Sequence, residues 1–285
     1  MSQHIDRVCV IGAGTMGHGI AQVSAMAGID VVLVDATAEL AERGYHRIRE
    51  NLEEGVKRQK VTPEQRDKTL ARITFAGDLA VAGSANLVIE AIPEKIELKR
   101  TLFAELERQV SPGVLLGSNT SSLSITDLQA PLTHPQRLLG LHFFNPVHIN
   151  KLVEVIHGRQ TSKDALESAL EYVRRIEKEP VVIKDSPGFA TSRLGVLLGL
   201  EAMRMVEEGV ASAEDIDKAL ELGYRHPMGP LRLTDLVGLD VRLDIARYLH
   251  QKLGAEQFRP PAILERKVAE GKLGKKTGEG FYKWS

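Results

Sequence analysis

The sequence has only one cysteine, Cys9, and no apolar run long enough to cross a bilayer as a helix. A single thiol excludes an internal disulfide and a zinc site built from paired cysteines. The formal net charge is −1, so the chain also lacks the basic excess that is typical of proteins binding nucleic acids or anionic membranes. We therefore expect no metal, nucleic-acid or membrane partner.

The amino terminus also lacks a secretory pattern, because no charged segment precedes an apolar stretch within residues 1–7. We therefore expect a cytoplasmic protein. The hydrophobic fraction of 43% and the charged fraction of 26% are ordinary for a globular protein, and 285 residues suit two domains.

Short apolar segments alternate with helical patterns over the first two-thirds of the chain. The segments are rich in branched residues and lack strict alternation, which indicates strands buried on both faces. They comprise residues 8–11, 31–34, 87–92, 114–116 and 138–143. Helical patterns at 16–27, 39–58 and 96–109 separate them. Repeated strand–helix–strand units predict an α/β fold with a doubly wound, mostly parallel sheet of the Rossmann type.

The alternation stops at Asp185-Ser186-Pro187-Gly188. Just before it, two further strands at 153–156 and 181–183 flank a helix at 162–177. From Phe189 onward only helical periodicity remains. We therefore predict a dinucleotide-binding domain over 1–184 and an all-helical domain over 185–285.

A glycine pattern, G-x-G-x-x-G, follows the first strand at once. Gly12 permits the tight turn, Gly14 removes a side chain that would block a pyrophosphate, and Gly17 lets helix and strand pack closely. Thr15 and Met16 precede the following helix, whose amino terminus presents unpaired N–H groups to the phosphates.

An acid, Asp35, ends the second strand eighteen residues after Gly17. Its carboxylate is placed to accept hydrogen bonds from both hydroxyls of an adenosine ribose. The same charge would repel a 2′-phosphate, and Ala36-Thr37 offers no arginine to neutralise one. The pattern therefore favours NAD over NADP. FAD uses a similar fingerprint, but a flavoprotein usually has a longer chain.

Two polar segments stand at the ends of apolar strands, where an open α/β sheet borders its ligand crevice. One is the run Ser118-Asn119-Thr120-Ser121-Ser122, whose hydroxyls either bind a substrate or cap the helix that begins near Ile125. The other carries His142. The next strand holds Glu154 among apolar neighbours, and a buried carboxylate needs a partner. A His–Glu pair would hold one imidazole tautomer and stabilise the imidazolium. His148 and His157 are near enough in sequence to compete for this role.

Together these motifs resemble the 3-hydroxyacyl-CoA dehydrogenase family, particularly its short bacterial 3-hydroxybutyryl-CoA dehydrogenases. The resemblance covers nearly the whole chain. Its motifs are VIGAGTMGHGIAQ at 10–22, VIEAIPEKIELK at 88–99, SNTSSLSIT at 118–126, GLHFFNPV at 140–147, LVEVI at 152–156, DSPGF at 185–189, HPMGPLRLTDLVGLD at 226–240 and KTGEGFY at 276–282.

The resemblance implies a general base, His142, oriented by Glu154, and a hydrogen bond from Ser121 to the substrate oxygen. Further residues that it places around the NAD site are Ala91, Glu94, Lys99 and Asn145. Asn51 and Arg58 match positions at the coenzyme A end of the substrate, although Lys57 and Lys60 compete with Arg58. Many relatives have an asparagine where this chain has Ser192, which is either a substrate-binding hydroxyl or an ordinary helix residue. A homodimer, formed in part by residues 194–205, is implied in the same way.

The expected reaction is the NAD-dependent oxidation of a short (S)-3-hydroxyacyl-CoA to the 3-oxoacyl-CoA, and its reverse, by a stand-alone enzyme of fatty acid β-oxidation, butanoate or aromatic-acid catabolism. Two other functions stay open. A related dehydrogenase would use the same residues on a free 3-hydroxy acid or a sugar acid, and an NAD-binding protein without catalysis would use only the nucleotide fingerprint.

Overall fold

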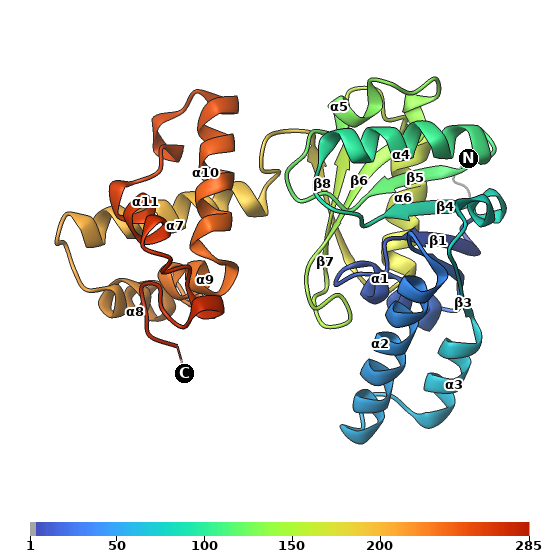
Figure 1. Ribbon diagram of the computed structural model, residues 1–285, viewed down its shortest axis with the longest axis horizontal. Coiled ribbons are helices and arrows are strands. Elements are labelled where there is room, and N and C mark those ends of the chain that lie inside the picture. Colours follow the sequence, from blue (N-terminus) through green and yellow to red (C-terminus); the bar gives the residue numbers. More distant parts are fainter. Residues whose placement is uncertain (1–3, 285) are drawn as a thin grey trace. The chain divides into compact units, whose positions relative to one another are not determined.

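In the computed structural model, which describes residues 4–284, the apolar segments of the first part of the chain pair into one sheet (Figure 1). The order of its strands is β3-β2-β1-β4-β5-β6-β7-β8. Their bounds are β1 Arg7–Ile11, β2 Asp30–Val34, β3 Ile73–Ala76, β4 Leu87–Glu90, β5 Leu115–Ser118, β6 Leu138–Phe143, β7 Leu152–His157 and β8 Glu179–Lys184.

All neighbouring strands from β3 to β6 are parallel, whereas β7 runs antiparallel to β6 and parallel to β8. The carboxyl ends of β1, β4, β5 and β6 therefore lie at one edge of the sheet, and β7 begins at that edge. The order reverses between β1 and β4, so this edge contains the switch point at which open α/β sheets bind ligands. The predicted mostly parallel, doubly wound sheet is confirmed.

Helices connect most strands of the sheet, whereas a loop joins β6 to β7. Right-handed crossovers in opposite directions from the switch point place helices on both faces. The apolar sides of α1, α2 and α6 join one core cluster with the sheet, and Ser24 of α1 meets the hydroxyl of Tyr172 of α6 at 2.7 Å inside it. The helical bounds are α1 Gly17–Met26, α2 Ala38–Lys57, α3 Pro63–Ala71, η1 Leu79–Ser84, α4 Ile96–Gln109, α5 Ile125–Gln129, η2 Pro135–Arg137 and α6 Lys163–Arg175.

Side-chain caps explain where several helices begin. Thr37 accepts a hydrogen bond from the Leu40 backbone N–H at the start of α2, and Ser162 does the same for α6. Thr62 and Gln65 form a reciprocal capping box on α3, whose first residue is a proline. Each cap satisfies backbone donors that the first helical turn leaves unpaired.

The chain divides into two units, the first ending at Ser186 and the second beginning at Pro187. The second unit consists of helices around its own core, which includes Leu200, Met203, Leu239 and Phe258. Its elements are α7 Thr191–Glu207, α8 Ala213–Gly223, α9 Pro230–Val237, α10 Leu239–Leu253, η3 Glu256–Phe258, α11 Ala262–Ala269 and η4 Lys275–Thr277.

The strand β3 is the one element of the sheet that the sequence pattern did not predict. It is only four residues long, and the segment Ile73-Thr74-Phe75-Ala76 lies at the sheet edge with two of its side chains exposed. An edge strand of this kind lacks the apolar run by which the central strands are recognised.

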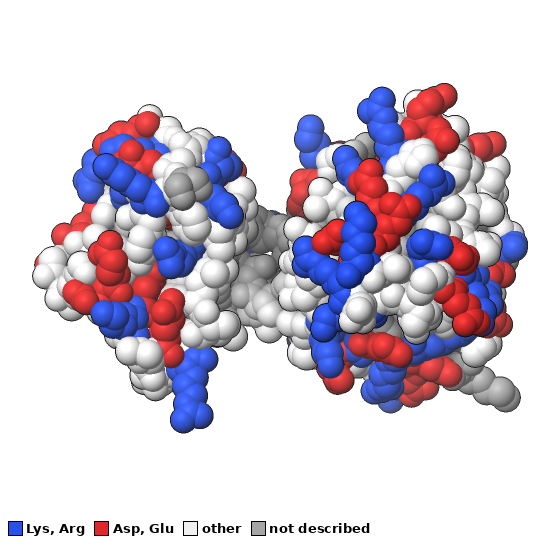
Figure 2. All heavy atoms as spheres, turned by 90° about the horizontal axis from the view of Figure 1, so that it is seen from below, with Lys and Arg blue, Asp and Glu red and all other residues white. Residues whose placement is uncertain are grey.

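Among the described residues, no helix is both long and apolar enough to cross a membrane. The face shown in Figure 2 carries acidic and basic side chains intermixed on both units.

Candidate active site

The turn after β1 carries the three glycines of the nucleotide fingerprint. Gly12 has φ +94°, and a β-carbon added there would lie 2.7 Å from the Ala91 carbonyl oxygen. A β-carbon on Gly17 would lie 1.6 Å from the Gly12 carbonyl oxygen, so this position excludes every other residue. By contrast, a β-carbon on Gly14 would meet nothing within 4 Å. The turn therefore needs Gly12 and Gly17 for folding, whereas Gly14 leaves open space beside the start of α1.

Asp35 anchors this turn from the end of β2. Its two carboxylate oxygens accept hydrogen bonds from the backbone N–H groups of Ala13 and Ala36, both at 2.7 Å. The carboxylate lines a cavity of about 770 Å³ that also includes Gly12, Ala36, Ile92 and Leu98. An open glycine turn, a helix amino terminus and an acid beside a cavity fit the phosphates and adenosine of a dinucleotide.

His142 and Glu154 form a pair at the same edge of the sheet. They are cross-strand partners in the antiparallel ladder of β6 and β7. The Nδ1 atom of His142 lies 2.7 Å from the Glu154 Oε2 atom. Glu154 is fully buried, while His142 is 7% exposed. Because the carboxylate contacts Nδ1, we expect a bound molecule to exchange its proton with the other ring nitrogen, Nε2.

A second acid, Glu94, holds the serine-rich loop that follows β5. Its Oε1 atom accepts hydrogen bonds from the Thr120 hydroxyl at 2.6 Å and from the backbone N–H of Ser121 at 2.9 Å and of Ser122 at 3.2 Å. Burial acts to raise the pKa of Glu94, but Lys99 and these hydrogen bonds bring the pKa below its ordinary value. Glu94 is therefore ionised at neutral pH and fixes the position of Ser121.

Beneath this loop lies a buried ion pair, and sequence analysis gave no role to its acid. Glu90 is fully buried at the end of β4, and both its oxygens contact the Lys99 ammonium, at 2.8 and 2.9 Å. Lys99 also lies 3.1 Å from Glu94, and Ser118 donates a hydrogen bond to Glu90. Burial raises the pKa of Glu90, against the attraction of Lys99. The signal was present in the sequence, since Glu90 ends an apolar strand just as Glu154 interrupts one.

Glu94, Lys99 and Ser121 thus meet in one network. Asn145 is exposed in the loop after β6, where its carbonyl oxygen accepts a hydrogen bond from the Asn150 amide at 2.7 Å. Ala91 follows β4 directly and donates its N–H to the Ile11 carbonyl oxygen at 2.7 Å.

The residues expected at the coenzyme A end lie on α2. The Asn51 amide is 3.5 Å from the Gln22 side-chain oxygen of α1. Arg58 is exposed and forms an ion pair with Glu54, one turn earlier, at 2.7 Å. Neither residue contacts the His142–Glu154 pair within the described part of the chain. Ser192 belongs to the second unit, where it is half-buried in the first turn of α7.

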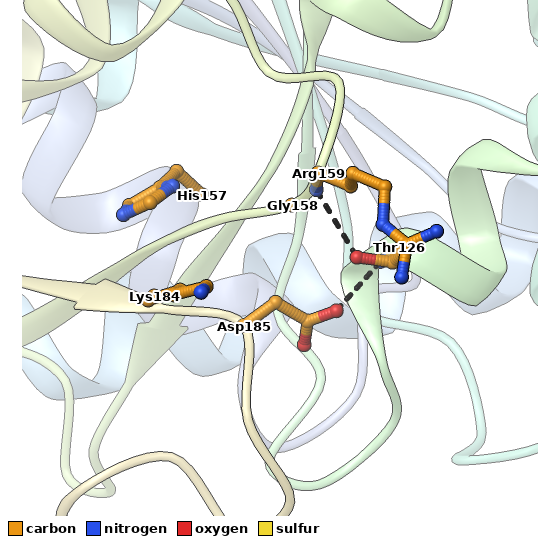
Figure 3. A pocket seen from close by; sticks show the side chains of 6 residues that line it. All are labelled: Thr126, His157, Gly158, Arg159, Lys184 and Asp185. Atoms are coloured by element: carbon orange, nitrogen blue, oxygen red, sulfur yellow. Dashed lines mark hydrogen bonds between the residues drawn. The ribbon is translucent and has the colours of Figure 1, made fainter.

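A second cavity, of about 310 Å³, lies where β7 and β8 end (Figure 3). It is lined by His157, Lys184 and Asp185, and the Asp185 carboxylate accepts a hydrogen bond from the Thr126 N–H at 2.8 Å. Because β7 is antiparallel to β6, His157 lies at the sheet edge opposite the one that holds His142. His148 is exposed in the loop after β6. The structure thus pairs only His142, of these three histidines, with Glu154.

Comparisons with known proteins agree with this geometry. Residues 7–186 match the family model described as "3-hydroxyacyl-CoA dehydrogenase, NAD binding domain". Residues 188–284 match "3-hydroxyacyl-CoA dehydrogenase, C-terminal domain".

Relatives match over almost their whole length. A 3-hydroxybutyryl-CoA dehydrogenase of Mycobacterium tuberculosis is 45% identical over 99% of both chains. The mitochondrial hydroxyacyl-coenzyme A dehydrogenase of Sus scrofa is 44% identical over 98% of this chain and 91% of its own. The crystal structure of (S)-3-hydroxybutyryl-CoA dehydrogenase from Ralstonia eutropha is 38% identical and superposes with a TM-score of 0.97, covering 99% of this chain and 100% of that one. The chain belongs to the 3-hydroxyacyl-CoA dehydrogenase family and is an NAD-dependent oxidoreductase.

Proposed function

We propose that the protein oxidises (S)-3-hydroxyacyl-CoA to 3-oxoacyl-CoA and catalyses the reverse reduction, with 3-hydroxybutyryl-CoA as a short-chain substrate. The observation that carries this proposal is the 2.7 Å contact between His142 Nδ1 and the buried Glu154 carboxylate. The pair stands at the same sheet edge as the glycine turn after β1. Relatives named for this activity support the same substrate class.

His142 is the general base of the proposed oxidation. Its Nε2 atom accepts the proton of the substrate 3-hydroxyl group, and Glu154 stabilises the imidazolium that results. In the reduction, the protonated imidazole returns this proton to the 3-oxygen. Ser121 donates a hydrogen bond to the same oxygen, and Ser192 of the second unit supplies a further hydroxyl in this proposal.

The dinucleotide is held by the first unit in this proposal. Its phosphates lie against the open turn at Gly14 and the start of α1, and Asp35 accepts the ribose hydroxyls. When bound, the nicotinamide supplies the hydride acceptor or donor. Glu94, Lys99 and Asn145 shape the nicotinamide half of the site, and the buried Lys99–Glu90 pair keeps the loop containing Ser121 in place.

The stereochemistry of the substrate tests this proposal. NADH formation is to be followed with (S)- and (R)-3-hydroxybutyryl-CoA at equal concentrations. We expect turnover of the (S) thioester and a rate at least about 100-fold lower with the (R) thioester, because one enantiomer alone presents its hydroxyl to the imidazole and its C3 hydrogen to the nicotinamide in the same bound orientation. Equal rates with the two enantiomers would contradict a single base held by Glu154.

Replacing Asp35 by asparagine tests the assignment of the cofactor. The amide retains one acceptor oxygen but loses the charge that repels a 2′-phosphate, and hydrogen bonds to charged groups contribute about 1.5–3 kcal/mol. We expect the preference for NADH over NADPH, measured as the ratio of kcat/KM values, to fall about 10- to 100-fold. Asp30→Asn, at the other end of β2 where Asp30 pairs with Arg72, is the matched control. An unchanged ratio in Asp35→Asn would remove Asp35 from the cofactor site.

The coenzyme A end of the substrate is assigned to α2, where Asn51 and Arg58 are our candidates. Lys57 and Lys60 are exposed beside Arg58. In this proposal a phosphate of coenzyme A replaces Glu54 as the partner of the Arg58 guanidinium. A rise in KM for acetoacetyl-CoA in Arg58→Ala, without a change in kcat, would support this assignment.

We also propose that the second unit binds substrate and forms a homodimer. Apolar side chains are exposed on helices that pack against each other, including Leu194 and Leu198 of α7 and Leu233 and Val237 of α9. Exposed apolar surface of this kind marks interaction sites. Sedimentation velocity is expected to give the mass of two chains, and a single-chain mass would contradict the dimer.

We also propose that the protein is located in the cytoplasm, which cell fractionation tests.

A further inference from the structure

The serine loop, residues 119–124, connects β5 to α5 and contains Ser121. Near its start, Glu94 accepts the backbone N–H of Ser121 at 2.9 Å. At its far end, the hydroxyl of Ser124 caps α5 by accepting the Asp127 N–H at 3.1 Å. The position of Ser121 therefore depends on what holds each of the two ends of this loop.

A second acid, Asp185, holds the far end of the serine loop. Its Oδ2 atom accepts a hydrogen bond from the Ser124 hydroxyl at 2.7 Å and another from the Thr126 backbone N–H at 2.8 Å, the latter drawn in Figure 3. The other oxygen, Oδ1, is buried and meets no donor among the described residues. Within the described part of the chain, all hydrogen bonds of this carboxylate therefore go to the junction between the serine loop and α5.

The sheet fixes Asp185 in turn. Asp185 follows β8 directly, and its backbone N–H donates to the carbonyl oxygen of His157, the last residue of β7, at 2.9 Å. Although 61 residues separate Asp185 from Ser124 in the chain, the fold brings the two side chains into contact. An oxygen buried without a donor costs free energy, so stability alone does not account for an acid at this position.

We propose that Asp185 is a positioning residue for the reaction, which fixes the far end of the serine loop and thereby directs the Ser121 hydroxyl at the substrate oxygen. This inference rests on the proposed function, in which Ser121 donates a hydrogen bond to that oxygen. Ser121 and Ser124 are three residues apart and are joined by at most about 10 Å of chain. A shift of Ser124 is therefore passed on to Ser121, which Glu94 holds from the other side.

Replacing Asp185 by alanine removes both hydrogen bonds to the end of the loop. We expect kcat for the reduction of acetoacetyl-CoA to fall at least about tenfold, because a misplacement of about 1 Å in a reacting site costs roughly 100-fold. The KM for NADH should stay within about twofold, since Asp185 does not contact the glycine turn or Asp35. Asp185→Asn keeps one acceptor oxygen in the same place, so its kcat should lie between those of the wild type and Asp185→Ala.

The matched control is Glu107→Ala, which removes another acid that anchors a loop through two backbone donors. Glu107, on α4, accepts the N–H groups of Thr133 and His134 at 2.8 and 2.7 Å, beyond the carboxyl end of α5. Its loss should lower Tm, as the loss of Asp185 does, but leave kcat within about threefold of the wild type. An equal fall of kcat in both variants would reduce Asp185 to a structural residue and overturn the inference.

A double-mutant cycle with Ser121→Ala identifies the route of the effect. If Asp185 acts through the Ser121 hydroxyl, Asp185→Ala lowers kcat by less than about threefold when Ser121 is already alanine. The same fall in both backgrounds, or an unchanged kcat in Asp185→Ala alone, would overturn the inference and leave the proposed function intact. Where circular dichroism shows that Asp185→Ala does not fold, Asp185→Asn takes its place in the cycle. Absence of turnover by the wild type would overturn the proposed function as well.

Discussion

Replacing His142 by alanine is expected to lower kcat for the reduction of acetoacetyl-CoA by about 100- to 10,000-fold, the usual contribution of a positioned acid or base. The binding of NADH should persist, because the glycine turn and Asp35 do not contact this side chain. The measurement is a steady-state assay of NADH absorbance together with fluorescence titration of NADH. A loss of less than about tenfold would exclude His142 as the proton donor.

Two further variants distinguish a proton donor from a structural histidine. Glu154→Gln removes the buried charge that stabilises the imidazolium, so kcat for the reduction should fall at least about tenfold. His148→Ala is the matched control, because His148 is exposed and follows the same strand. We expect its kcat to stay within about threefold of the wild type. An unchanged kcat in Glu154→Gln would contradict the pairing as the source of the base.

Replacing Lys99 by methionine is expected to destabilise the first unit by about 3–5 kcal/mol, because it leaves the fully buried Glu90 carboxylate without its counter-charge. For a unit of this size the change corresponds to a fall in Tm of roughly 10 °C. Differential scanning calorimetry of the wild type and the variant measures it. The loop containing Ser121 should also lose its support, since Lys99 contacts Glu94.

The control for this result is Lys95→Met, which removes an exposed lysine one turn earlier. Its Tm should stay within about 2 °C of the wild type, as for most surface substitutions. The double variant Glu90→Gln/Lys99→Met is expected to regain part of the loss, because no unpaired buried charge remains. If Lys99→Met had the same Tm as the wild type, the Lys99–Glu90 pair would have no structural role.

Much of the fold follows from periodicity. The central strands were predictable because burial on both faces leaves uninterrupted branched runs, as in residues 138–143. The helix at 96–109 was predicted with its observed bounds. The edge strand β3 was not predicted, because a strand at an exposed edge does not need a run of apolar residues, and Phe75 and its neighbours form none. The antiparallel direction of β7 also has no local signal, since it depends on how the chain turns after residue 143.

The candidate site was predictable in part. A buried acid needs a partner, and this argument predicts the pairing of Glu154 with His142 from the sequence. The same argument applied to Glu90, but its partner Lys99 lies on a separate helix and resembles an ordinary solvated lysine in the sequence. Only the fold shows that Lys99 is 1% exposed.

The most direct test of the proposed function follows NADH absorbance with acetoacetyl-CoA, with free acetoacetate as the control at the same concentration. We expect oxidation of NADH by the thioester and at least about 100-fold slower oxidation by the free acid, because binding of the coenzyme A moiety contributes to the rate. Equal turnover of the two would instead support a dehydrogenase of free hydroxy acids. If NADH bound but neither compound reacted, the proposed dehydrogenation of 3-hydroxyacyl-CoA would be contradicted.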